Sequence, residues 1–342
     1  MKRFRLHPFM IFLSALSCGA LLLLSGCGTA SSGSKSAESD KDKLTVVTTL
    51  FPYYDFVRQI AGDQVNLTMM VPAGMDTHSF EPTPFDLVNL QKADLFLYNG
   101  GELEGWVDSV LDSIQTDDLT VFNMIDYFKS HEDTAALLLE EDEEEEEHGA
   151  GKSHETDEHI WTSPVLAQTM VSAICQLLSE ADPDHASLYQ ENAASYTAQL
   201  QQLDTQFRQV VSNSPLSVMV FGDKSPFRYF THTYGLDYYA AFTACSSEAE
   251  PGAATLALLV DTVREEKIPV VYYVELSSQK VADNICEATG AQKLLFHSCH
   301  NVTADDFKAG VTYLDLMRQN LEHLKTGLGY ETDLSADADH QL

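Results

Sequence analysis

The chain has 342 residues, of which 44% are hydrophobic, so it is long enough to bury the cores of two domains. Acidic residues outnumber basic ones by 52 to 20, which gives a formal net charge of −32. This charge excludes a nucleic-acid-binding role, because phosphates are bound by Lys and Arg. An acidic surface suits the attraction of cations or simple solubility.

The N-terminus predicts export from the cytoplasm. Basic residues at positions 2, 3 and 5 precede an apolar stretch from Phe9 to Leu24, which is too short to span a bilayer comfortably. Its ending, "LSGC", resembles a bacterial lipobox, so residues 1–26 are predicted to be a signal peptide and Cys27 the lipid-modified first residue. Residues 27–43 are a Gly/Ser-rich tether. We expect an extracytoplasmic monomer, held at the cell membrane by the lipid on Cys27.

An N-terminal lobe is predicted over residues 44–165. Apolar strands at 44–50, 65–71, 94–100 and 119–122 alternate with helical patterns at 53–62 and 84–93. Such alternation predicts a parallel sheet covered on both faces. A loop over 132–156 interrupts the lobe and contains eight consecutive acidic residues, with His148 and His154 inside the loop and His131 directly before it. The run of like charge predicts a solvated loop, which either captures metal transiently or has no function.

A connecting backbone helix is predicted over 166–212. Its second part, 184–211, carries apolar residues at helical spacing and would extend roughly 40 Å at 1.5 Å per residue. Strands and helices alternate again in a C-terminal lobe over 213–328, which ends in one long helix from 304 to 328, and residues 329–342 form a polar tail. The fold class is therefore α/β, with two (β/α) lobes joined by a rigid helix. Ligands bind at the carboxyl ends of parallel strands, so the site is predicted in the cleft between the lobes.

Two histidines of the N-terminal lobe are candidate metal ligands. His78 lies in the loop "VPAGMDTHSFEPTP" after a strand, and His159 lies in "DEHIWTSP" directly before a helix. Neutral imidazole is a common ligand of Zn²⁺ and related ions. A single loop histidine is more often an ordinary surface residue, so the prediction of a metal site depends on the presence of both histidines.

Several motifs in consistent order resemble one known family. "GMDTHSFEPTP", "DEHIWTSP", "PFRYFTHTYGL" and "VYYVELSSQKVADNICEATGAQKL" are similar to segments of the zinc- and manganese-binding solute-binding proteins of ABC transporters. The similarity extends from Leu44 to about Gly327. It implies two lobes on a rigid helix, a metal ion between them and an ABC permease as partner. The acidic loop lies where zinc-binding members carry a His-rich loop.

The resemblance implies a ligand set that departs from the family pattern in the second lobe. His78 and His159 match the ligands of the first lobe. Lys224 aligns with the third histidine of the family, and His297 aligns with its carboxylate ligand. We therefore expect His78, His159 and His297 to bind the metal, so that it ties the lobes together. Asp223 is the candidate fourth ligand, and Glu248 and His300 are weaker candidates.

Four cysteines belong to the mature chain. Cys245 and Cys299 both follow strands of the second lobe, which favours a disulfide between them, with two free thiols as the alternative. Cys175 and Cys286 lie on predicted helices and are expected in the core.

The predicted function is capture of a divalent transition metal and its delivery to an ABC permease. Three imidazoles favour Zn²⁺ over Mn²⁺, which prefers oxygen ligands. One alternative is a metal-dependent hydrolase, since a zinc site with three histidines can activate water, but no HExxH motif or similar signature is present and we expect no enzyme. A surface adhesion or metal-buffering lipoprotein is the other alternative. The long packed helix predicts small lobe movement, and large compaction on metal binding in solution scattering would contradict it.

Overall fold

The first lobe is built on a four-stranded parallel sheet. The computed structural model describes residues 43–139, 156–242 and 250–331. The strand order is β2-β1-β3-β4, and every neighbouring pair is parallel, with bounds β1 Leu44–Thr48, β2 Val65–Met69, β3 Leu95–Tyr98 and β4 Thr120–Asn123. The predicted parallel sheet is thus confirmed.

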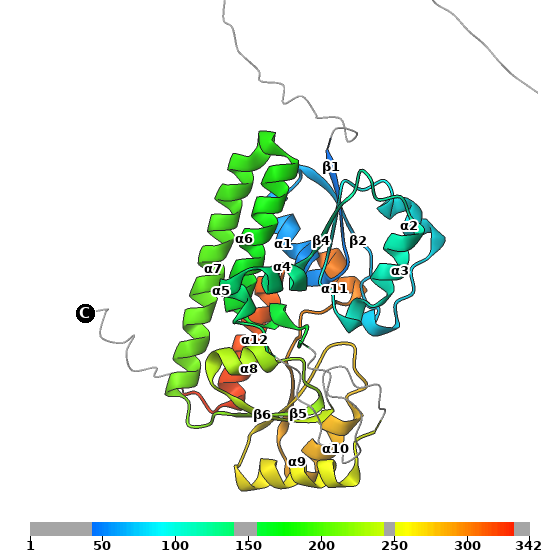
Figure 1. Ribbon diagram of the computed structural model, residues 1–342. Helices are drawn as coiled ribbons and strands as arrows, with labels where there is room; N and C mark the ends of the chain where they lie inside the picture. The colour runs from blue at the N-terminus through cyan, green and yellow to red at the C-terminus, as the bar shows by residue number, and fades with distance from the viewer. Residues whose placement is uncertain (1–42, 140–155, 243–249, 332–342) are drawn as a thin grey trace, which may run out of the picture. The chain divides into compact units, whose positions relative to one another are not determined.

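Successive residues of the central strands enter different cores, as the two-residue period of a strand requires. Val46 of β1 packs with α1 (Phe51–Ala61), whereas Val47 packs with α2 (Pro84–Leu90) and α3 (Trp106–Ser113). The sheet is therefore covered on both faces (Figure 1). The sequence pattern did not predict α3 or two other helices of this lobe, α4 (Met124–Ser130) and α5 (Glu132–Ala135).

Two long helices follow the first lobe. α6 (Pro164–Ala181) begins with Pro at its first position, and α7 (Ala186–Asn213) is a single helix of 28 residues that runs alongside α6 (Figure 1). Apolar residues at steps of three and four bury one stripe of α7, namely Tyr189, Ala193, Tyr196, Leu200, Leu203, Phe207 and Val210. The long helix predicted over 184–211 is confirmed, whereas the segment predicted as one connecting helix over 166–212 consists of the two helices α6 and α7.

The second lobe repeats the plan of the first. Its parallel sheet has the order β6-β5-β7-β8, with bounds β5 Val218–Lys224, β6 Asp237–Phe242, β7 Val270–Tyr273 and β8 Gln292–Leu295. Helices α9 (Ala253–Glu265) and α10 (Lys280–Thr289) pack on one face, and α8 (Arg228–Tyr234) lies on the other side with α7.

After β8 the chain returns to the first lobe, so part of the predicted C-terminal lobe (213–328) also contacts the first lobe. The Gly74 N–H donates to the Val302 carbonyl (2.7 Å), and Arg58 donates to the Val311 carbonyl (2.8 Å). The single helix predicted over 304–328 is two helices, α11 (Ala304–Ala309) and α12 (Tyr313–Gly327). Gly310, at φ 76°, ends α11, and a capping box formed by Thr312 and Asp315 starts α12.

One apolar core extends through both lobes. It includes Val46 and Leu97 of the first sheet, Phe221 and Tyr272 of the second, and the buried stripe of α7. A core shared in this way resists independent movement of the lobes. No helix in the described ranges is long and apolar enough to cross a membrane.

Candidate metal centre

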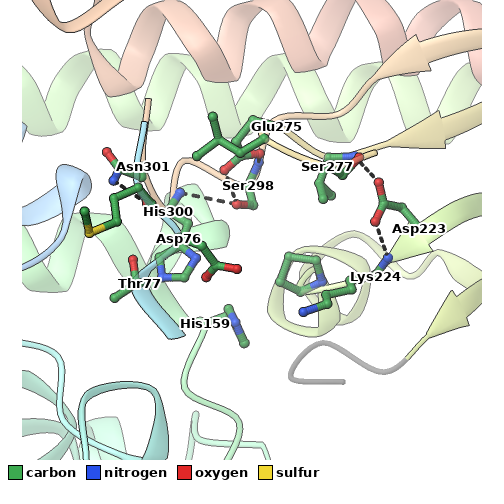
Figure 2. A pocket seen from close by; sticks show the side chains of 14 residues that line it. Asp76, Thr77, His159, Asp223, Lys224, Glu275, Ser277, Ser298, His300 and Asn301 are labelled. Atoms are coloured by element: carbon green, nitrogen blue, oxygen red, sulfur yellow. Dashed lines mark hydrogen bonds between the residues drawn. The ribbon is translucent and has the colours of Figure 1, made fainter. Parts of the chain in front are cut away.

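A pocket of about 140 Å³ lies where the two lobes meet, at the carboxyl ends of their strands (Figure 2). The first lobe supplies Asp76 and His159, and the second supplies Asp223, Lys224 and Glu275. The remaining lining residues come from both lobes and the connection after β8: Met75, Thr77, Pro226, Val274, Leu276, Ser277, Ser298, His300 and Asn301. The predicted position of the site, at the strand ends between the lobes, agrees with this pocket.

His159 is held in the orientation of a metal ligand. Its side chain is 1% exposed, and its Nδ1 lies 3.1 Å from Oδ1 of Asp157, which also accepts the His159 backbone N–H at 2.8 Å. A carboxylate on Nδ1 favours the tautomer with the proton on that atom, which leaves the Nε2 lone pair for a metal. Asp157 is a supporting residue that the sequence analysis missed, although it stands two positions before His159.

Two buried carboxylates support the backbone on which His159 stands. Glu158 accepts the N–H groups of Glu102 and Leu103, and Glu104 accepts those of Asn99 (2.7 Å) and Gly100 (2.9 Å). Asn99 in turn donates to the carbonyl of Glu158 at 3.1 Å. The N–H groups after β3 therefore fix the segment that ends in His159.

Glu104 makes the stability of this lobe depend on pH. Burial, with a smaller contribution from Glu158, raises the pKa of Glu104 from 4.5 to about 7. Because the folded protein then binds a proton more tightly than the unfolded chain, this group favours folding at low pH. Its contribution decreases as pH rises from about 4.5 to about 7.

Replacement of Glu104 by glutamine is expected to remove this dependence. Glutamine keeps one oxygen for the two N–H donors but carries no charge. Relative to the variant, the wild type should lose about 3 kcal/mol of unfolding free energy between pH 4.5 and pH 8. Urea unfolding of the metal-stripped proteins across this range measures the difference, and parallel pH profiles would refute the assignment.

His300 lies against His159 in the pocket. The two ring centres are 6.2 Å apart, and the His300 ring also packs on Trp161 at 5.4 Å. Two imidazoles on one tetrahedral Zn²⁺ have ring centres about 5 Å apart, since each Zn–N bond is about 2 Å. The separation of the two rings is therefore about 1 Å larger than in such a zinc site.

The segment that carries His300 is attached to the first lobe. The Phe51 N–H donates to the His300 carbonyl (3.3 Å), and the Asn301 side chain donates to the carbonyls of Pro72 (2.9 Å) and Met75 (2.8 Å). Although His300 follows a strand of the second lobe, its position is therefore set by the loop that contains His78.

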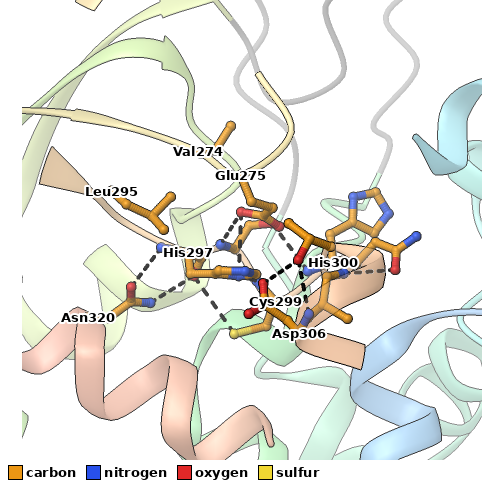
Figure 3. A network of polar contacts seen from close by, with 12 residues as sticks. Val274, Glu275, Leu295, His297, Cys299, His300, Asp306 and Asn320 are labelled. Atoms are coloured by element: carbon orange, nitrogen blue, oxygen red, sulfur yellow. Dashed lines mark hydrogen bonds and ion pairs between the residues drawn. The ribbon is translucent and has the colours of Figure 1, made fainter. Parts of the chain in front are cut away.

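His297, the ligand expected from the resemblance, does not line this pocket. Figure 3 shows its ring beside Glu275, with Nδ1 3.5 Å from the carboxylate. The same Nδ1 accepts the Cys299 N–H at 2.9 Å, and Asn320 holds both the N–H and the carbonyl of His297. These contacts stabilise the loop around His297, whose role as a metal ligand stays a prediction, and His300, three residues later, lines the pocket.

The carboxylates of the second lobe bind mainly to its own donors. Asp223 lines the pocket, and its two oxygens accept the backbone N–H groups of Lys224 (2.8 Å) and Val274 (3.2 Å). Glu275, which was not predicted although it stands two residues after the end of β7, accepts the N–H and the hydroxyl of Ser298. Asp223 as fourth ligand stays a prediction.

Gly222 explains how Asp223 and Lys224 reach this edge of the pocket. A Cβ at Gly222 would lie 2.4 Å from Cα of Ala282, so only glycine allows α10 to pack this closely on β5.

Several expected site residues lie outside the described parts of the chain. Cys27, Glu248, Cys245, His148 and His154 are among them, as is the His78 side chain, although the backbone of His78 belongs to the 3₁₀ helix Thr77–Ser79. Cys299 is a free, fully buried thiol in the structure, and its disulfide with Cys245 stays a prediction. Cys175 is buried, as expected, whereas Cys286 is only partly buried. Within the described side chains, no three His, Cys, Asp or Glu groups are placed to hold a metal.

The family model for "Zinc-uptake complex component A periplasmic" matches residues 46–327. The chain belongs to this family, ZnuA. The high-affinity zinc uptake system protein ZnuA of Bacillus subtilis is 37% identical over 310 residues, which cover 90% of this chain and 94% of that protein. The zinc-binding lipoprotein AdcA of Streptococcus pneumoniae is 34% identical over 90% of this chain, which spans only 60% of AdcA.

Solved structures agree with this assignment. The metal-dependent lipoprotein YcdH of B. subtilis superposes with a TM-score of 0.69 at 32% identity, over 84% of this chain and 100% of that one. The Zn(II)-bound ZnuA-like domain of S. pneumoniae AdcA superposes with a TM-score of 0.66 at 31% identity, over 84% and 99%. The laminin-binding protein Lmb of Streptococcus agalactiae, described as an adhesin with metal-transporting activity, reaches 0.68 at 26% identity, over 84% and 99%. The predicted two-lobe fold and the class of zinc-uptake solute-binding proteins are confirmed.

Proposed function

We propose that this protein captures Zn²⁺ outside the cytoplasm with His78, His159 and His300 and delivers it to an ABC permease. The approach of His159 and His300 within one pocket is the observation that carries the proposal. His78 is included because its backbone lies in the loop to which the His300 segment is hydrogen-bonded. The ZnuA family and its zinc-binding relatives support Zn²⁺ as the cargo.

The chemistry of this donor set suits Zn²⁺. Imidazole nitrogen binds zinc well, whereas manganese prefers sites richer in oxygen. Asp157 increases the donor strength of His159, as a carboxylate behind a ligating histidine does in zinc proteins. Because only neutral imidazoles bind, acid would release the metal.

Removal of one imidazole tests the site. Metal-stripped wild-type protein should bind one Zn²⁺ tightly in competition with a chromophoric chelator. His159→Ala should weaken binding by at least about a hundredfold, since each ligand contributes several kcal/mol to a zinc site. Replacement of the exposed His232, which lies on α8, by alanine is the matched control. Equal affinities for wild type and His159→Ala would refute the site.

The mode of attachment to the cell is a further part of this proposal. A lipid on Cys27 would keep the monomeric binding protein at the membrane beside its permease. Mass spectrometry of the mature N-terminus should show acylated Cys27, and Cys27→Ala should release the protein from the membrane fraction. A mature protein that begins at another residue and carries no lipid would refute the anchor.

Neither alternative function is proposed. A hydrolase needs a positioned general base, and the described carboxylates of the second lobe, Asp223 and Glu275, are already hydrogen-bonded to backbone or Ser298 donors. Adhesion has support only in the likeness to Lmb, and no feature of the described chain favours it.

A further inference from the structure

The pocket contains a lysine where a metal site would ordinarily place a ligand. Lys224 ends β5, the central strand of the second sheet, and Figure 2 shows its side chain reaching into the pocket on the side that faces His159. In the described part of the chain, its ammonium group has neither a hydrogen bond nor an ion pair. A charged amine cannot ligate a metal and repels one.

The neighbouring carboxylates do not neutralise this charge by direct contact. Both oxygens of Asp223 accept backbone N–H groups, and both oxygens of Glu275 accept donors of Ser298. Asp76 lies on the opposite, first-lobe side of the pocket. Among the described residues, no carboxylate contacts the Lys224 ammonium, which Figure 2 shows on the side of the pocket toward His159.

The proposed ligands all belong to one side. His159 stands on the first lobe, and the His300 segment is hydrogen-bonded to Phe51 and to the loop Pro72–Met75. Three imidazoles leave one position of a tetrahedral Zn²⁺ open, as in zinc sites that bind an external ligand. On a metal held by these ligands, that position would face the second lobe, where the charged Lys224 side chain lies.

We propose that the pocket takes its metal together with a small carboxylate, one oxygen of which binds the metal while the other accepts a hydrogen bond from Lys224. A single carboxylate would then fill the open coordination position of the metal and accept a charged hydrogen bond from the ammonium group. The cavity of about 140 Å³ has room for it, since one water occupies about 30 Å³. This inference rests on the proposed function and defines its cargo as a metal–carboxylate complex. Carboxylate-bearing metabolites that chelate zinc are the substrate class.

Cobalt gives a direct readout of the added ligand. The metal-stripped full chain is loaded with one Co²⁺, and its visible absorption is followed as sodium acetate is added at constant ionic strength set with sodium nitrate. The wild type should show a saturable spectral change. Lys224→Gln should bind Co²⁺ but require about tenfold more acetate, since a charged hydrogen bond is worth about one such factor. Lys280→Gln, an exposed lysine at the start of α10, should behave as the wild type.

The possible results distinguish a failure of the carboxylate bridge from a failure of the proposed zinc-binding function. If the protein binds one Co²⁺ but its absorption spectrum does not change when acetate is added, the carboxylate bridge is refuted and the proposal of metal capture is not. The same acetate dependence in wild type and Lys224→Gln would overturn the role of Lys224. A response to inorganic phosphate but not to acetate would overturn the substrate class. Failure to bind Co²⁺ or Zn²⁺ at all would instead refute the proposed function.

Discussion

Replacement of His300 by alanine is expected to weaken Zn²⁺ binding by at least about a hundredfold, whereas replacement of His297 should leave it within about threefold of the wild type. The difference follows from position. His300 packs beside His159 in the pocket, while His297 is enclosed by Glu275, Cys299 and Asn320. Competition with a chromophoric chelator at neutral pH measures both affinities.

The structural role of His297 requires a control for folding. Loss of its Nδ1 leaves the buried Cys299 N–H without an acceptor, so His297→Ala should lower the unfolding free energy by about 1–3 kcal/mol. Binding should therefore be measured well below the melting temperature, with His297→Gln as a second variant that keeps an acceptor. If His297→Gln loses Zn²⁺ and His300→Ala keeps it, the ligand set proposed here is wrong and the family alignment holds.

Asp55→Asn is expected to lower the unfolding free energy by about 3 kcal/mol. Asp55 is completely buried in α1 and accepts hydrogen bonds from Arg58 (2.6 and 3.0 Å), Gln59 (3.0 Å) and Tyr196 of α7 (3.3 Å). It also accepts the backbone N–H of Tyr313 (2.7 Å), the first residue of α12, where a negative charge is favourable. The substitution leaves the partly buried Arg58 without its charged partner and weakens the junction of three helices.

Urea unfolding at pH 7, followed by circular dichroism and by the fluorescence of the buried Trp161, measures this effect. Asp63→Asn is the matched control, because Asp63 is exposed just after α1 and should change stability by less than about 0.5 kcal/mol. A loss below about 1 kcal/mol for Asp55→Asn would show that water replaces the missing interactions.

Much of the architecture was predictable from local pattern. Continuous apolar runs such as Leu95–Tyr98 predicted buried parallel strands, and the spacing along α7 predicted a helix with one buried stripe. The short helices α3, α4 and α5 were not predicted because they lie in segments of mixed polarity, α3 and α4 after strands and α5 directly after α4. The division between α11 and α12 was also missed, although Gly310 and the capping pair Thr312 and Asp315 were visible as signals.

The site was predictable in its location and only partly in its residues. His159 follows from its motif, and the strand-end rule places it in the cleft. The choice between His297 and His300 could not be made from sequence, because they stand three positions apart in one loop. The direction of that loop is set by hydrogen bonds from Asn301 and Phe51 to distant partners, which no local pattern reveals.

The apolar core that continues from the first sheet through α7 to the second has an evolutionary consequence. In a protein whose lobes have separate cores, recombination can exchange one lobe between relatives at the linker. In this protein, such an exchange would combine two parts of a single core whose side chains come from different relatives and do not fit each other. Poor packing of this kind in a close-packed core lowers the unfolding free energy by several kcal/mol. Specificity in this family is thus expected to change through point substitutions at the pocket rather than through the exchange of lobes.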